Sequence, residues 1–189
     1  MELDEAITNT VQIRKYTNEK PPIEDIVELV ETANKAFTHG NIHILSFTIV
    51  DDPDIIKDIA EGCQQRHIEK APYVIVMTSK DTQAKRLFDK RAKKYIKHHA
   101  GAAAQIILLK ASSLGLSGSW IGAFSEATIE NAINSPEEIE LVMTFGYKMD
   151  RDKTISKQRK KPELTGRLFF NAYGNRFYKP LKKLRRGDM

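Results

Sequence analysis

Residues 114–124 read Leu-Gly-Leu-Ser-Gly-Ser-Trp-Ile-Gly-Ala-Phe, a stretch rich in glycine that follows an apolar run. Gly115 is placed to end a helix, because glycine adopts the left-handed conformation of a C-cap without strain. The next residues, 117–121, predict a short strand or turn. Gly122 and Ala123 follow it, and such small residues let a backbone approach a flat ring closely. A simple glycine turn with its flanking aromatic side chains in the core is the alternative.

Helical and extended patterns alternate on both sides of this stretch. The helix expected before it, 99–114, is apolar on nearly all sides, which is typical of a helix that is buried all round or lies at a subunit interface. The alternation favours an α/β or α+β class in which helices cover a sheet. The remaining expected helices are 3–11, 23–36, 54–61, 82–97 and 125–134, and the expected strands are 45–50, 73–77 and 139–147.

The composition indicates a folded domain. The chain has 189 residues, of which 41% are hydrophobic and 29% charged, so bulk disorder is excluded. A single cysteine, Cys63, permits no intrachain disulfide. Residues 1–5 are acidic and do not resemble a signal peptide, and the apolar run 100–109 is too short to span a bilayer. We therefore expect a soluble, cytoplasmic protein without a membrane partner.

Positive charge is concentrated in two places. The net charge is +5, and residues 176–189 contain six basic residues and one acidic residue, so this tail carries the whole excess. Residues 85–97 contain seven basic residues and one acidic residue. Apolar residues recur among them at helical spacing, which favours a solvated helix face over a nucleic-acid site. Nucleic acid is therefore not an expected partner.

Four separated stretches carry the functional argument. They are Gln-Ile-Arg-Lys-Tyr at 12–16, Ala-Phe-Thr-His-Gly-Asn at 36–41, the stretch 114–124, and Gly-Tyr at 146–147 followed by Lys-Gln-Arg at 157–159. In this order, with an apolar helix before the third, they resemble the nitroreductase family of FMN-dependent oxidoreductases. The resemblance covers about residues 5–175.

The resemblance implies an α+β sandwich with a central, mostly antiparallel sheet flanked by helices. It also implies a homodimer with exchanged terminal segments and two FMN sites at the interface. Residues 1–175 would form one FMN-binding domain, followed by the basic tail 176–189. The implied activity is ping-pong transfer of electrons from NADH or NADPH to a small planar acceptor such as a nitroaromatic or a quinone.

The resemblance also implies which residues contact the cofactor. Arg14, Lys157 and Arg159 would hold the phosphate dianion, since guanidinium groups bind phosphate in a bidentate way. The backbone N–H groups of Gly122 and Ala123 would face the flavin N5. The other implied contacts are Gln12, Phe37, Thr38, Asn41, Gln64 and Ile121, and the loop 37–41 would reach the flavin of the other subunit. No side chain is expected to act as a catalytic acid or nucleophile.

The sequence departs from the family pattern at several positions. Thr10 stands where the family has an arginine, and Gln12 replaces a small hydroxyl residue. The loss of one charge-assisted bond to phosphate predicts FMN binding about tenfold weaker. After Asn41 the sequence Ile-His-Ile-Leu replaces x-Gln-Pro-Trp, and Ser117 replaces a glycine. These changes point to an atypical acceptor.

Two other classes of function compete with this interpretation. His39, His43, Cys63 and His67 are four potential zinc ligands, but the first two flank Gly40-Asn41 and the Cys-x3-His spacing is uncommon, so we expect no metal site. The second alternative is a non-catalytic protein that binds flavin, or one that binds nucleic acid through residues 85–97 and the tail. No Ser/His/Asp or paired-carboxylate pattern indicates a hydrolase.

Overall fold

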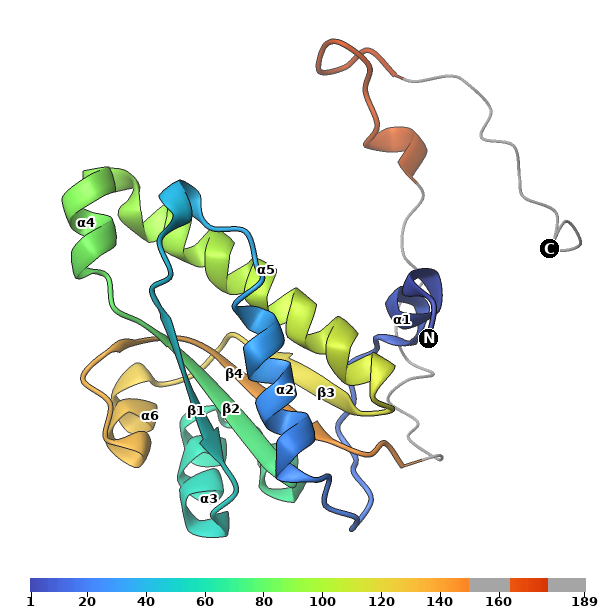
Figure 1. Ribbon diagram of the computed structural model, residues 1–189, viewed down its shortest axis with the longest axis vertical. Coiled ribbons are helices and arrows are strands. Elements are labelled where there is room, and N and C mark those ends of the chain that lie inside the picture. Colours follow the sequence, from blue (N-terminus) through green and yellow to red (C-terminus); the bar gives the residue numbers. More distant parts are fainter. Residues whose placement is uncertain (150–163, 177–189) are drawn as a thin grey trace, which may run out of the picture. The chain divides into compact units, whose positions relative to one another are not determined.

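A four-stranded antiparallel sheet organises the computed structural model, which describes residues 1–149 and 164–176 (Figure 1). Its order is β1-β2-β4-β3, with every neighbouring pair antiparallel. The central strand β2 is buried along its whole length, as its continuous apolar sequence predicts. The strands are β1 (Leu45–Val50), β2 (Tyr73–Ser79), β3 (Ser117–Ile121) and β4 (Glu138–Gly146).

Helices cover both faces of the sheet. The long helix α5 (Ala92–Ser113) and α2 (Ile23–Ala33) pack on one face, and α3 (Pro53–Gly62) and α6 (Glu126–Ile133) pack on the other (Figure 1). The alternation of side chains along β2 builds both layers. Ile75 and its neighbours two residues away join the first core, whereas Val74 and Val76 join the second. The α+β class with a mostly antiparallel sheet is thereby confirmed.

The prediction of separate helices at 82–97 and 99–114 is wrong. The chain forms α4 (Thr82–Phe88), a 3-10 turn at Asp89–Arg91, and then α5 without interruption. The break lies at Asp89, whose φ of 47° is left-handed, a conformation that aspartate tolerates better than most residues. Nothing in the sequence between Ile96 and Ala100 interrupts a helix, so α5 continues through the two histidines there.

The other elements agree with the sequence to within a few residues, and β1 has the predicted bounds. Asp52 caps α3 by accepting a hydrogen bond from the Asp54 N–H at 2.9 Å. Gly115 follows α5 with a φ of +75°, which confirms the predicted C-cap. The remaining elements are α1 (Leu3–Asn9) and the 3-10 turns η1 (His39–Asn41), η2 (Arg66–Lys70) and η4 (Leu164–Gly166).

The chain divides into two compact units, 1–156 and 157–189. All elements named so far except η4 belong to the first. The single domain over 1–175 and the exchange of terminal segments remain predictions. Within the part of the chain that the structure describes, no helix has both the length and the apolar character needed to cross a bilayer.

Candidate functional site

The segment 12–16 is fixed to the edge of the sheet beside β3. Gln12 forms a parallel bridge with Gly118, and the Ile13 N–H donates to the Gly118 carbonyl at 3.3 Å. The Ser119 hydroxyl donates to the Ile13 carbonyl. The Tyr16 hydroxyl bonds to the hydroxyl of Thr144, in β4, at an O–O distance of 2.6 Å. These contacts hold the backbone on both sides of Arg14.

Two glycines make this close fit possible. A Cβ at Gly118 would overlap the Thr144 carbonyl oxygen and lie 2.9 Å from the Phe145 ring. A Cβ at Gly146 would lie 2.7 Å from the Pro72 ring and 2.8 Å from the Tyr16 ring. A larger residue at Gly118 would push β3, to which Gln12 is bridged, away from β4, and a larger residue at Gly146 would displace Tyr16. Gly118 therefore allows β3 to approach β4 closely. It lies next to Ser117, which stands where the family has a glycine.

Arg14 lies between two buried residues of this segment and is itself exposed. It is close enough to His67, in η2, to affect its ionisation. Burial lowers the pKa of His67, and the positive charge of Arg14 lowers that pKa further. The Nε2 atom of His67 is buried and has no hydrogen-bond partner among the described residues. A neutral imidazole with an unused polar atom thus lies within electrostatic reach of the Arg14 cation.

Gln64 lies just before η2 and is exposed, with a left-handed φ of 53°. It lines a cavity of about 460 Å³ together with residues of α3 and η2. The structure therefore places Gln64 three residues before His67, within the connection from α3 to β2. The sequence analysis treated His67 only as a possible metal ligand. Its relation to Arg14 has no local signal, because 52 residues separate the two in the chain.

The turn after β3 is open, as expected for a backbone that faces a ligand. Ile121 is buried as the last residue of β3, whereas Gly122 and Ala123 are exposed. A Cβ at Gly122 would meet only the Trp120 indole, at 3.9 Å. Trp120 and Phe124 are half-buried and pack against opposite core layers. The flanking aromatics therefore have a packing role, and the turn between them is accessible.

The loop 37–41 lies away from Arg14, beside the N-terminal part of α5 and next to α4 (Figure 1). Phe37 is 95% exposed, and Asn41 is exposed with a left-handed φ of 55°. The loop is held by His39, whose ring stacks on that of Tyr95 with centroids 4.0 Å apart. Thr38 is half-buried. One chain therefore does not bring the loop to the Arg14 segment.

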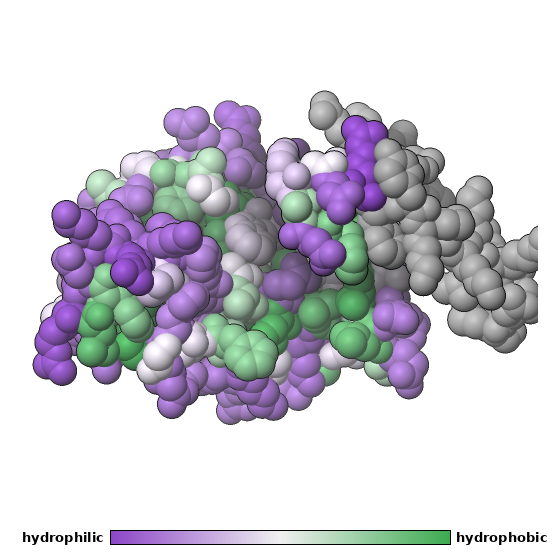
Figure 2. Space-filling view, turned by 90° about the horizontal axis from the view of Figure 1, so that it is seen from above, coloured by the Kyte–Doolittle hydropathy of each residue, from purple (hydrophilic) through white to green (hydrophobic). Residues whose placement is uncertain are grey.

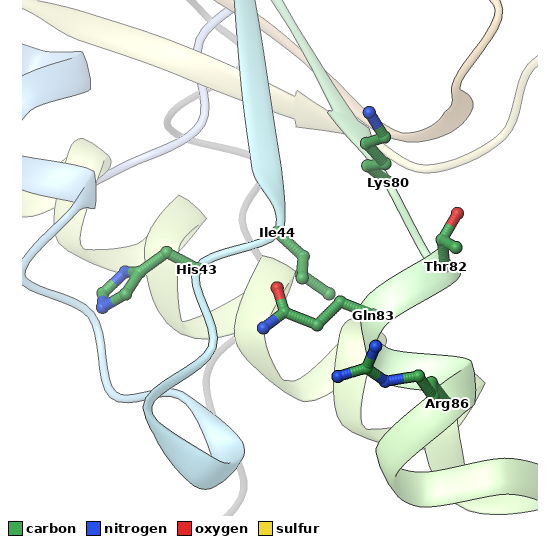
Figure 3. A pocket seen from close by; sticks show the side chains of 6 residues that line it. All are labelled: His43, Ile44, Lys80, Thr82, Gln83 and Arg86. Carbon is green, nitrogen blue, oxygen red and sulfur yellow. The ribbon is translucent and has the colours of Figure 1, made fainter.

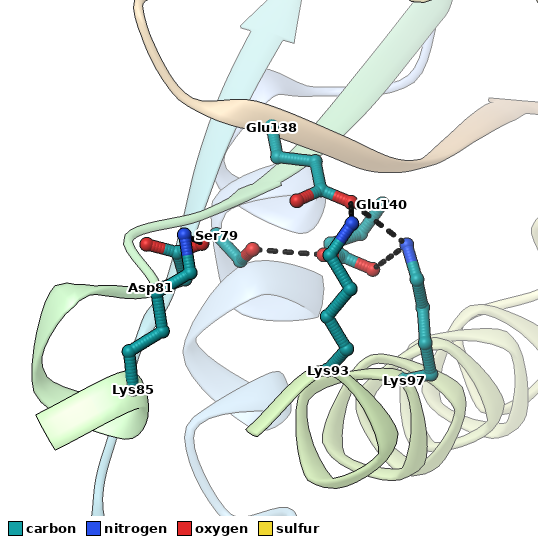
Figure 4. Close-up of polar contacts among 7 residues, drawn as sticks. All are labelled: Ser79, Asp81, Lys85, Lys93, Lys97, Glu138 and Glu140. Carbon is teal, nitrogen blue, oxygen red and sulfur yellow. Dashed lines mark hydrogen bonds and ion pairs between the residues drawn. The ribbon is translucent and has the colours of Figure 1, made fainter. Parts of the chain in front are cut away.

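The basic run 85–97 is partly neutralised by carboxylates (Figure 4). Lys97 Nζ lies 2.8 Å from a carboxylate oxygen of Glu140, whose other oxygen accepts a bond from Ser79. Burial opposes the charge of Lys97, but Glu140 and Glu138 outweigh it and raise the pKa of Lys97. Lys93 also pairs with Glu138, and Lys85 with Asp81. These pairs leave fewer cations for a polyanion.

Three further expectations concern single residues. Lys157 and Arg159 lie outside the described residues. Cys63 is buried, and burial raises the pKa of its thiol to about 11, so it is not a thiolate at neutral pH. Across residues 1–149 and 164–176, no three His, Cys, Asp or Glu side chains gather closely enough to hold a metal ion.

The sequence model of the nitroreductase family matches residues 59–147. The iodotyrosine deiodinase of Thermotoga neapolitana is 21% identical over 166 residues, which cover 73% of this chain and 84% of that protein.

Solved structures show the same fold. The NfrA1 nitroreductase of B. subtilis superposes with a TM-score of 0.81 at 20% identity, covering 91% of this chain and 75% of that one. The NADPH:FMN oxidoreductase of Vibrio harveyi superposes with a TM-score of 0.76 at 21% identity, covering 90% and 77%.

Proposed function

We propose that the chain, which matches the nitroreductase family model over residues 59–147, is an FMN-dependent oxidoreductase that passes electrons from NADH or NADPH to a small planar acceptor. The observation that carries the proposal is the anchored segment 12–16, which holds Arg14 within electrostatic reach of His67, whose buried Nε2 has no hydrogen-bond partner among the described residues. A cation next to an unsatisfied polar atom is what a phosphorylated, heteroaromatic ligand requires.

The described residues fit FMN. Arg14 supplies a guanidinium group for the phosphate, with Gln12 on the same anchored segment. The resemblance adds Lys157 and Arg159 as further cations, and these two lie outside the described residues. The open turn presents the backbone N–H groups of Gly122 and Ala123 to the flavin ring. Bound FMN supplies the redox chemistry between the nicotinamide donor and a nitroaromatic or quinone acceptor. The protein's part is to bind and orient.

His67 and Gln64 complete this part of the site. The lowered pKa of His67 keeps the imidazole neutral near pH 7, so its Nε2 offers a hydrogen bond without adding charge beside Arg14. Gln64 brings an exposed amide from the same connection. Thr10 adds no cation. FMN affinity therefore depends more heavily on Arg14 than it would if position 10 were also an arginine.

A second copy of the chain would complete the site. The loop 37–41 with Thr38 and Asn41 is distant from Arg14 within one chain, and a partner subunit would bring it to the flavin. The outer side of α5 suits such contact, because Ala102 and Ile106 are apolar and only half-buried. We therefore propose a homodimer with exchanged terminal segments, in which each site contains residues of both subunits.

Reconstitution tests the cofactor. The protein incubated with FMN and then desalted should retain flavin absorbance, and NADH or NADPH should bleach it. Arg14→Ala should weaken FMN binding about tenfold or more, with unchanged unfolding in the absence of FMN. Lys15→Ala, the adjacent exposed cation, is the matched control and should bind FMN normally.

Colourless protein with no titratable FMN affinity would overturn the proposal. Bound flavin that neither nicotinamide reduces would instead support the non-catalytic flavin-binding alternative.

A further inference from the structure

A cavity of about 480 Å³ opens where α4 meets the connections to β1 and β2 (Figure 3). Its polar lining consists of basic groups and hydrogen-bond donors, with no carboxylate. Arg86 and Gln83 point from α4 toward the segment of Ile44, and Lys80 and Thr82 stand above them in the view. The lining residues are His43, Ile44, Lys80, Thr82, Gln83 and Arg86.

The two cations of this cavity, Lys80 and Arg86, are not neutralised by any described carboxylate. Asp81 lies between them in sequence, but its carboxylate pairs with Lys85 (Figure 4). Within the described ranges, Lys80 and Arg86 make no ion pair, unlike Lys85, Lys93 and Lys97 nearby. A concave surface with unpaired cations has a positive potential that attracts an anion.

The cavity wall is fixed by the fold. The Lys80 N–H donates to the Ile44 carbonyl at 3.0 Å, which ties the end of β2 to the start of β1. Gln83 and Arg86 are three residues apart on α4, so both side chains share one helix face. Arg86 thus presents a planar set of donors that matches the oxygens of a phosphate.

The cavity also adjoins the loop 37–41. His43 follows this loop by two residues, and Ile44 lines a second, mostly apolar cavity with His39. A ligand in the larger cavity would therefore lie next to the segment assigned to the flavin under the proposed function. Its volume is in the range that holds a phosphate together with part of a nucleoside.

We propose that this cavity binds the 2′-phosphate of NADPH, so that the enzyme uses NADPH in preference to NADH. The inference rests on the proposed function for the identity of the donor. Arg86 makes the bidentate contact, Gln83 donates a hydrogen bond beside it, and Lys80 adds positive potential. NADH lacks the only group that these residues would recognise, so the selectivity lies in the 2′-phosphate.

Kinetics give the first test. The wild-type kcat/KM should be at least about tenfold higher for NADPH than for NADH, at fixed ionic strength. Arg86→Gln should lower the NADPH value about tenfold and leave the NADH value within about twofold. Lys94→Gln, an exposed cation of α5 that does not line the cavity, is the matched control and should change neither. Equal use of both donors by the wild type would overturn the inference.

Direct binding separates this inference from the proposed function. Calorimetry with the FMN-free protein should show tighter binding of adenosine 2′,5′-bisphosphate than of adenosine 5′-monophosphate, and Arg86→Gln should abolish the difference. That result supports the cavity even where no flavin reduction is seen. Equal binding of both nucleotides overturns the inference, as does binding of inorganic phosphate as tight as that of the bisphosphate.

Discussion

Cys63 shows at the scale of a residue why the redox chemistry is assigned to the cofactor. Burial raises the pKa of this thiol to about 11, so at neutral pH it is protonated and a poor nucleophile. We expect Cys63→Ser to reduce a quinone with NADH or NADPH within about threefold of the wild-type rate. Loss of turnover with FMN still bound would show that a thiol takes part.

His99 predicts how stability depends on pH. It is 5% exposed, and burial lowers its pKa below the ordinary 6.5, with a further contribution from the charges of His43 and His39. Because the folded pKa lies below the unfolded one, this contribution to stability is present above pH 6.5 and is lost as the pH falls through the folded pKa. The free energy of unfolding should therefore decrease on acidification.

The matched variant His99→Gln isolates this effect. Denaturant unfolding at about pH 7.5 and about pH 5 should show a smaller loss of stability for the variant than for the wild type. His67 titrates in the same direction and remains in both proteins, so the difference between them reports His99. Equal losses of stability in the two proteins would show that His99 does not cause the destabilisation at acid pH.

The packing of β3 against β4, and of the N-terminal segment against β3, depends on the absence of a side chain at Gly118. A side chain there has no space between the Thr144 carbonyl and the Phe145 ring. Gly118→Ala should lower the free energy of unfolding by about 1–3 kcal/mol, and it should weaken FMN binding because the Arg14 segment moves. Thermal unfolding and FMN titration measure the two effects.

Gly101→Ala is the control for this prediction at the scale of an element. Gly101 lies inside α5, and its added Cβ would come no closer than 3.8 Å to Trp120. Alanine favours a helix by about 0.5–1 kcal/mol over glycine, so this variant should be as stable as the wild type or slightly more stable. Equal destabilisation by both substitutions would contradict the role given to Gly118.

Local patterns predicted most of the elements but not the connections between them. The strand 45–50 and the C-cap at Gly115 follow from neighbouring residues, and both are confirmed. The break at Asp89 depends on one left-handed residue inside an otherwise helical pattern, which periodicity does not detect. The electrostatic influence of Arg14 on His67 depends on the sheet that brings distant segments together, so no local motif contains it.

At the scale of the whole molecule, Phe37 tests whether two chains share a site. It is 95% exposed, so its substitution removes no packing within one chain. Phe37→Ser should leave unfolding of the single chain unchanged and weaken FMN binding, because in the proposed homodimer the loop would act on the partner's flavin. Leu87→Ser, an exposed apolar residue on α4, is the control and should bind FMN normally.

Sedimentation measures the assembly directly. At low micromolar concentration the wild type should have about twice the chain mass of 21.5 kDa. Exposed apolar side chains on α1, α2 and the loop, among them Leu3, Ile7, Ile23 and Val27, provide surface for such an interface. On the face shown in Figure 2, hydrophobic patches are interrupted by hydrophilic residues. A monomer that binds FMN as tightly as the wild type would contradict the shared site.

The bridge between Gln12 and Gly118 has a consequence for solubility. β3 is the last strand of the sheet, and an uncovered last strand offers unpaired N–H and C=O groups to other chains. Residues 12–16 cover this edge of the sheet. Because Arg14 belongs to the same segment, a phosphate bound to it would also hold residues 12–16 against this edge. Light scattering during heating should show aggregation at a lower temperature without FMN than with it.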